Sequence, residues 1–167
     1  GLIESDRPVR DLPGWRPPRK VAIVGNAADP ADLQSVAPQL TFVVLRNAAD
    51  AQSDISDADI LIGSCSQSLL VQAARVHWVQ VMSAGVDQCL SAPLFRERGL
   101  LLTNMQRATG ALIGEHAIAL ALALARNLPT HLANQRQANW TYGRDGSMRT
   151  LIGKTLLVVG LGGAGME

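Results

Sequence analysis

The sequence is poor in several features that would assign it to a specialised class of protein. Its 167 residues include only two cysteines, 4% aromatic residues and a formal net charge of +1. A charge this close to zero argues against a large basic surface, so no nucleic-acid partner is expected. The cysteines, Cys65 and Cys89, are not in a spacing typical of metal or redox sites. We expect them to be buried thiols, which indicates a reducing, cytoplasmic compartment, and we expect no metal site.

Long hydrophobic runs, internal repeats and low-complexity segments are also missing. The unbroken apolar run at residues 117–125 has nine residues, whereas a membrane span needs about 20, so no membrane partner is expected. The first 20 residues carry four prolines and five basic residues without an apolar run, so no secretory signal is visible. Residues 1–19 are therefore predicted to form an extended, exposed arm.

From residue 20 onward, apolar runs alternate with helical patterns, which is typical of an α/β fold with a parallel sheet. Asp29 followed by Pro30 predicts the start of one helix, and Ser66 or Ser68 the start of a second. A short third helix passes through Leu94. Strands are predicted at residues 21–24, 42–45, 59–62, 77–82 and 100–103.

The most hydrophobic predicted helix runs from about residue 112 to residue 126. Glu115 and Arg126 suit the two ends of a helix dipole, and alanine is a poor strand former. A helix that is apolar on all sides must be covered by protein on more than one side. One face carries Ile113, Ala117, Leu120, Leu124 and Leu128, and the opposite side carries Ile118 and Leu122.

The segment Ser83-Ala84-Gly85-Val86-Asp87 follows the predicted strand at residues 77–82. Ligands of open α/β sheets bind at the carboxyl ends of the strands, and small residues leave backbone N–H groups open to a carboxylate. The alternative interpretation is an ordinary strand-to-helix turn with Asp87 as the N-cap.

The last residues form a G-x-G-x-x-G motif: Gly160, Leu161, Gly162, Gly163, Ala164 and Gly165. The apolar run at residues 156–159 before it predicts a buried strand, and the glycines suit a turn that binds a pyrophosphate. The alternative is a glycine-rich loop without a ligand. A following helix, a second strand and an acidic ribose-binding residue would complete the site, so we expect this chain alone not to hold a dinucleotide.

Candidate catalytic side chains are few. Glu115 and His116 are neighbours on a helix and point about 100° apart, so they cannot form a catalytic pair there. His116 is interpreted as structural, and His77 and His131 lack neighbouring partners of a catalytic triad. Arg107 could contact an anionic ligand, although a solvated arginine is the more common state.

Several motifs follow one another along the chain: HWVQVMSAGVD at 77–87, LTN at 102–104, GEHAIAL at 114–120, ARNLP at 125–129, Trp140 and GKTL at 153–156. This ordered series resembles the D-isomer-specific 2-hydroxyacid dehydrogenases. The resemblance implies a flavodoxin-like parallel-sheet substrate domain, followed by the first strand and glycine loop of a truncated Rossmann domain. The implied boundaries are an arm at 1–19, the substrate domain with an interdomain helix at 20–127, a connecting helix and loop at 128–153 and the start of the dinucleotide domain at 154–167.

The resemblance also implies roles for individual residues. Backbone amides of Ser83, Ala84 and Gly85 would meet the carboxylate of a small 2-hydroxy or 2-keto acid, and Ile113 would lie near the nicotinamide of NAD or NADP. The glycine loop would hold the pyrophosphate, and the helix at 112–128 would contribute to a homodimer. The family's catalytic Arg, its acidic partner and its acid/base His have no counterpart here. Gln106-Arg107-Ala108-Thr109 and Ala164 depart from the family pattern.

Three functional hypotheses follow from these observations. The favoured one is the N-terminal part of an NAD(P)-dependent oxidoreductase that transfers a hydride between nicotinamide and a D-2-hydroxy acid, with the chain inactive by itself. The second is a non-catalytic module that senses a carboxylate or a dinucleotide. The third is an oligomeric structural fragment.

Overall fold

The computed structural model describes residues 7–13, 15–47, 55–140 and 148–167 of the chain. The chain divides into two compact units, which meet in the sequence between Gln106 and Arg107. We call the first unit the sheet domain and the second the helical unit. Each is described by itself.

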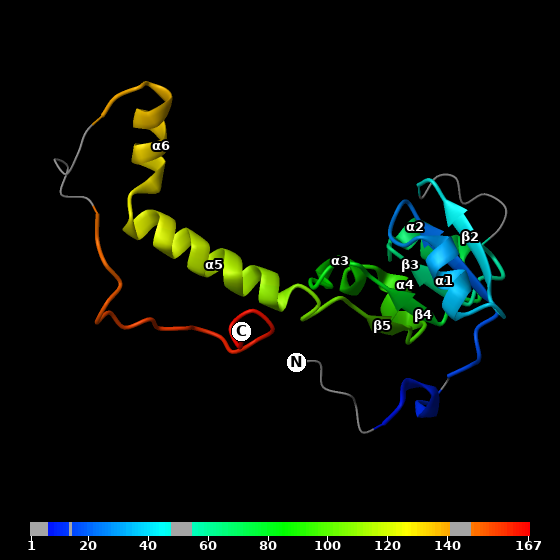
Figure 1. The fold of residues 1–167 in the computed structure, drawn as a ribbon. Helices are drawn as coiled ribbons and strands as arrows, with labels where there is room; N and C mark the ends of the chain where they lie inside the picture. Colours follow the sequence, from blue (N-terminus) through cyan, green and yellow to red (C-terminus); the bar gives the residue numbers. More distant parts are fainter. Residues whose placement is uncertain (1–6, 14, 48–54, 141–147) are drawn as a thin grey trace. The chain divides into compact units, whose positions relative to one another are not determined.

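The sheet domain is built on five parallel strands in the order β2-β1-β3-β4-β5 (Figure 1). This order places β1 between β2 and β3, as in doubly wound flavodoxin-like sheets. The five predicted strands are confirmed, with ends that differ by one to two residues. Their bounds are β1 Lys20–Val24, β2 Thr41–Leu45, β3 Ile60–Ile62, β4 Trp78–Gln80 and β5 Leu101–Thr103.

Four short helices connect the strands: α1 Pro30–Val36, α2 Gln67–Gln72, α3 Asp87–Leu90 and α4 Pro93–Glu97. The predicted start of α1 is confirmed, because the Asp29 carboxylate accepts a hydrogen bond of 2.8 Å from the Ala31 N–H. The N-cap of α2 is Ser66, whose hydroxyl makes no capping bond. Asp87 is the first residue of α3 and follows the N-cap Val86, so its interpretation as the N-cap is wrong by one residue.

Apolar side chains alternate between the two faces of the sheet and form a core on each. Ala22, Leu61 and Val79 belong to one cluster, which includes Leu69 of α2 and Phe95 of α4. The neighbouring positions along the strands form the second cluster, against which Leu33 of α1 packs. Both faces are covered, as the continuous apolar strands require. The strand residues of the second cluster are Val21, Ile23 and Ile60.

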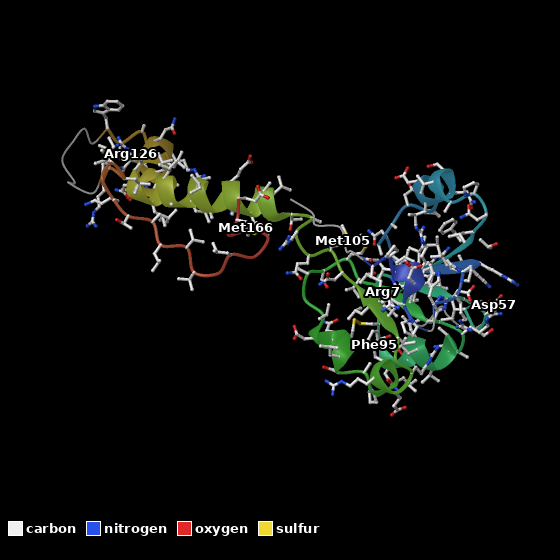
Figure 2. The ribbon with its side chains drawn as sticks, turned by 90° about the horizontal axis from the view of Figure 1, so that it is seen from below. Arg7, Asp57, Phe95, Met105, Arg126 and Met166 are labelled. Atoms are coloured by element: carbon white, nitrogen blue, oxygen red, sulfur yellow. A yellow bond between two sulfur atoms is a disulfide. The ribbon has the colours of Figure 1, made fainter. Side chains whose placement is uncertain are left out.

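The two cysteines form a disulfide, so the expectation of free thiols is wrong. Cys65 follows β3 and Cys89 lies in α3, which follows β4. Since β3 and β4 are neighbours in the sheet, their following segments meet, and the two Cα atoms are 5.1 Å apart. The bridge is drawn as a yellow bond in Figure 2. It removes the reason for expecting a reducing compartment.

The N-terminal arm is exposed over most of its described length, as predicted, but it also contacts the sheet domain. It contains a short 3-10 turn, η1 Val9–Asp11. The Trp15 ring packs edge-on against the His77 ring with centroids 5.8 Å apart, and its centroid is 5.7 Å from that of Trp78. The arm is thus attached beside the start of β4.

The helical unit contains α5 Gly110–Ala125 and α6 Leu128–Arg136. They are bent by 67° at a break where Asn127 has a positive φ of 51°. The helix predicted at about residues 112–126 is therefore confirmed as α5. The assignment of Leu128 to the same apolar face is wrong, because Leu128 begins α6. Within the described part of the chain, no single helix is long and apolar enough to cross a membrane; only α5 and α6 together, across the bend, reach the required length and composition.

The apolar side chains of α5 are not covered in this structure. Leu112 is 67% exposed, Leu120 51% and Leu124 71%. The expectation that protein covers this helix on more than one side is not met by the described part of this chain.

Residues 156–159 do not form the predicted strand. They have no regular secondary structure, and Leu157 and Val159 are 81% and 90% exposed. A strand needs a neighbour for its backbone N–H and C=O groups, and the described residues of the helical unit contain no strand. Residues 156–159 have the residue pattern of a strand, but the described residues of the helical unit supply no strand to pair with them.

Candidate carboxylate site and glycine loop

A hollow lies at the carboxyl edge of the sheet domain, where the segments after β3 and β4 meet. Ser83 and Gly85 line it from the β4 side, and Gly63 and Ser64 line it from the β3 side. The disulfide between α3 and the segment after β3 forms part of its wall. This is the edge at which parallel α/β sheets bind ligands.

The segment Ser83–Gly85 is exposed, and its carbonyl groups are occupied by the chain's own donors. The Ser83 hydroxyl donates a hydrogen bond of 2.7 Å to the Gly85 carbonyl. The Asn104 side-chain amide donates one of 2.8 Å to the Ala84 carbonyl, and the Met105 N–H donates one of 3.2 Å to the Ser83 carbonyl. These bonds fix the backbone on its acceptor side.

The donor side of the same segment is open. Within the described part of the chain, the backbone N–H groups of Ser83, Ala84 and Gly85 donate to no protein atom. Asp87 is the only charged residue among those that line the hollow in the described structure. A carboxylate here would therefore be held by backbone dipoles, without a basic side chain from this domain.

The side chain of Asn104 holds the Ala84 carbonyl in place, and this contact is not predicted by the LTN motif in which Asn104 lies. Asn104 directly follows β5, which pairs with β4, and so its amide reaches the segment after β4. The sequence signal that could have identified this contact is the position of Asn104 directly after a predicted strand. The segment Ser83–Gly85 follows another predicted strand and lies at the same edge of the sheet.

The predicted cofactor residues come together within the helical unit. The loop Gly160–Gly165 closes on itself, because a Cβ on Gly165 would collide with the Gly160 carbonyl oxygen. The loop also lies against the first turn of α5, since a Cβ on Gly110 would come within 2.5 Å of the Gly163 carbonyl oxygen. Ile113 is one turn further along α5 and is 52% exposed.

The other candidate residues do not form a catalytic or metal site. Glu115 and His116 are exposed on α5. The His77 ring contacts Arg16, with 3.0 Å from its Nε2 to the Arg16 carbonyl oxygen. His131 has a buried Nε2 without a partner among the described residues. No group of three or more His, Cys, Asp or Glu side chains in the described ranges is placed to hold a metal ion.

Comparison with known proteins gives relatives but no matching family model. The D-3-phosphoglycerate dehydrogenase of Methanocaldococcus jannaschii is 29% identical over 117 residues, which are 68% of this chain and 22% of that protein. The chain spans about a fifth of the length of the curated relatives it matches.

Solved structures that resemble this chain come from the same group of dehydrogenases as the curated relatives. A D-isomer specific 2-hydroxyacid dehydrogenase family protein from Aeromonas salmonicida is 29% identical with a TM-score of 0.64, over 75% of this chain and 42% of that one. The NADPH-dependent glyoxylate/hydroxypyruvate reductase of Sinorhizobium meliloti, solved with NADP and malonate, is 24% identical with a TM-score of 0.63, over 89% and 48%. Over the part that aligns, the chain resembles the D-isomer specific 2-hydroxyacid dehydrogenase family and shares its fold.

Proposed function

We propose that this chain is part of an NAD(P)-dependent oxidoreductase that transfers a hydride between nicotinamide and C2 of a D-2-hydroxy or 2-keto acid. The observation that carries the proposal is the segment Ser83–Gly85, whose carbonyls are occupied while its N–H groups point to no described protein atom. The relatives' names support the reaction class.

In this proposal the sheet domain binds and orients the substrate. The amides of Ser83, Ala84 and Gly85 donate hydrogen bonds to the substrate carboxylate. Asn104 keeps those amides in place through the Ala84 carbonyl, so it acts by positioning and does not contact the substrate. Pre-ordered backbone donors lose little freedom when the ligand binds, which favours both affinity and a fixed orientation.

In this proposal the glycine loop binds the pyrophosphate of a dinucleotide, and the local geometry of the loop supports this role. The backbone around Gly160–Gly165 leaves no room for a side chain at Gly165, whereas nothing lies within 4 Å of a Cβ placed on Gly162. Such a loop lets backbone N–H groups approach a phosphate. The bound nicotinamide would supply or accept the hydride. Ile113 would lie beside the nicotinamide, as the resemblance implies.

We expect the 167-residue chain alone neither to bind a dinucleotide tightly nor to turn over substrate. The strand that should precede the glycine loop is not formed, and no described residue takes the role of the family's acid/base His. Steady NAD(P)H oxidation by mass-verified, purified chain with a 2-keto acid would contradict this expectation.

The carboxylate site is testable in this chain directly. Titration of ¹⁵N-labelled protein with pyruvate should shift the amide signals of Ser83, Ala84 and Gly85, and the uncharged analogue pyruvamide should shift them much less. Gly85→Val should weaken the pyruvate effect, because it adds bulk to an exposed position where Gly85 now leaves space. Ala31→Val, on the exposed face of α1, is the matched control and should not change it.

In the intact protein, the same Gly85→Val change should raise the substrate KM while cofactor affinity holds. An unchanged KM would show that the assignment of the carboxylate site is wrong. Amide shifts that are the same for pyruvate and pyruvamide would do so as well.

We further propose that α5 packs against a second copy of the chain. Its exposed leucines would bury apolar surface worth about 25 cal/mol per Å². Light scattering after size exclusion should show a dimer, and Leu120→Lys should shift it to monomer, whereas Leu132→Lys on α6 is the control. A wild-type chain that stays monomeric at high concentration would refute the proposal.

A further inference from the structure

A second hollow lies at the opposite, amino edge of the sheet domain, between the N-terminal arm and the residues that precede β4 and β5. Leu12, Trp15 and Arg16 line it from the arm. His77, directly before β4, and Leu100, directly before β5, line it from the sheet. Its residues play no part in the carboxylate site or in the glycine loop.

The hollow carries positive charge that no carboxylate among its lining residues balances. Arg16 and Arg98 both line it, and Asp and Glu are absent from the described lining. Burial lowers the pKa of Arg98, and the nearby charge of Arg16 lowers it further. Two guanidinium groups close enough to repel each other would be stabilised by an anion between or beside them.

Arg98 is fixed in place by four hydrogen bonds to backbone carbonyls. Its Nη1 donates to Leu70 and Ala73 at 3.0 Å each, and its Nη2 donates to Ala74 at 2.7 Å and Val76 at 2.6 Å. The Nη donors of this side chain are therefore used by the chain itself. Arg98 contributes a fixed positive charge to the hollow and does not act as a flexible clamp.

Arg16 has donors left for a ligand. Its Nη2 donates a hydrogen bond of 2.8 Å to the Arg75 carbonyl and lies 3.3 Å from the His77 Nδ1. Its Nε and Nη1 groups bond to no atom in the described ranges. A guanidinium that is anchored on one side and open on the other suits an oxyanion, because planar N–H donors match its oxygens.

Apart from His77, the remaining residues of the described lining are apolar. Leu12 and Trp15 of the arm and Leu100 of the sheet surround the basic groups. We propose that this hollow binds a small organic anion, with its oxyanion group on Arg16 beside the fixed charge of Arg98 and its apolar group against Leu12 and Trp15. Such a ligand would hold the arm to the sheet domain from both sides, and the site is independent of the proposed function.

Benzoate is a suitable probe, because it combines a carboxylate with an apolar ring, and benzyl alcohol is its uncharged counterpart. Titration of the ¹⁵N-labelled chain with benzoate should give saturable shifts of the Trp15 indole N–H and the Gly99 amide. Arg16→Gln should weaken binding about tenfold, as expected for the loss of one charge-assisted contact. Arg10→Gln, on the same arm but outside the lining, should leave the affinity unchanged.

A second pair of variants tests the site without altering the arginines. Leu12→Asp should abolish benzoate binding by charge repulsion, whereas Leu12→Asn should reduce it less. Three results would overturn the proposal: equal affinity in wild type and Arg16→Gln, equal shifts with benzyl alcohol, or shifts confined to the Ser83–Gly85 amides. The last result would place benzoate in the other hollow.

Discussion

Asp59 should contribute more to the stability of the sheet domain than any neighbouring charge. It is the buried charged residue of the described core, with a side chain 3% exposed. Its Oδ2 accepts hydrogen bonds from the N–H groups of Arg19 at 2.8 Å and Lys20 at 3.3 Å, and its Oδ1 accepts one from Arg75 Nη2 at 3.3 Å. Asp59 thus joins the end of the N-terminal arm to the start of β3.

The size of the effect follows from these bonds. A hydrogen bond to a charged group contributes about 1.5–3 kcal/mol, and a buried donor left without a partner carries a further penalty. Asp59→Ala leaves the backbone N–H groups of Arg19 and Lys20 without this acceptor. We therefore expect a loss of about 3 kcal/mol in the free energy of unfolding. Asp59→Asn keeps a carbonyl oxygen for these N–H groups, and we expect a loss of about 1–2 kcal/mol.

The contribution should depend on pH. Burial raises the pKa of Asp59, but the N–H groups of Arg19 and Lys20 and the charge of Arg75 lower it more, so the net pKa is below its ordinary value. A carboxyl whose pKa is lower in the folded state stabilises the fold above its unfolded pKa of about 3.9, and this stability is lost as the pH falls through the folded pKa. The difference between wild type and Asp59→Asn should therefore shrink below about pH 4.

Urea unfolding of the full chain, followed by tryptophan fluorescence, measures these changes because Trp15 and Trp78 belong to the sheet domain. Asp57→Ala is the matched control: its carboxylate pairs with Lys20 at 2.7 Å but is exposed, so little change is expected. Two results would contradict this role of Asp59: a loss for Asp59→Ala no larger than that for Asp59→Asn, or a loss for Asp57→Ala that equals either of them.

Three further changes have expected outcomes in the same unfolding assay. Leu69→Ala removes a side chain that is 0% exposed and should cost about 2–5 kcal/mol, whereas Val71→Ala, 63% exposed on the same helix, should cost much less. Gly63→Ala should destabilise the domain more than Gly99→Ala. Both glycines have a positive φ, but only a Cβ added at Gly63 meets another atom, the Ala27 Cβ at 2.5 Å. Equal losses for the two variants would contradict this. Reduction of the disulfide, which spans 24 residues, should lower the unfolding free energy by about 3 kcal/mol, and no change on reduction would count against the bridge.

Local sequence patterns predicted the five strands of the sheet domain and the helices α1, α2 and α4 in their order along the chain. The apolar runs are short and bounded by turn residues, and caps such as Asp29-Pro30 act within a few residues, so local patterns suffice to find them. The motif around Ser83–Gly85 likewise predicted a candidate site at the carboxyl end of β4, where the hollow lies. These predictions rest on local information, and they are confirmed here because the sheet domain supplies the neighbouring strands that each element packs against.

Contacts between segments that are distant in the sequence depend on how the strands are arranged in the sheet, and local patterns do not predict them. The Cys65–Cys89 bridge forms because β3 and β4 are neighbours, and Asn104 reaches the Ala84 carbonyl because β5 lies beside β4. Conversely, the apolar run at residues 156–159 has a strand's composition and still forms no strand, because strand formation requires backbone partners that a residue pattern cannot supply.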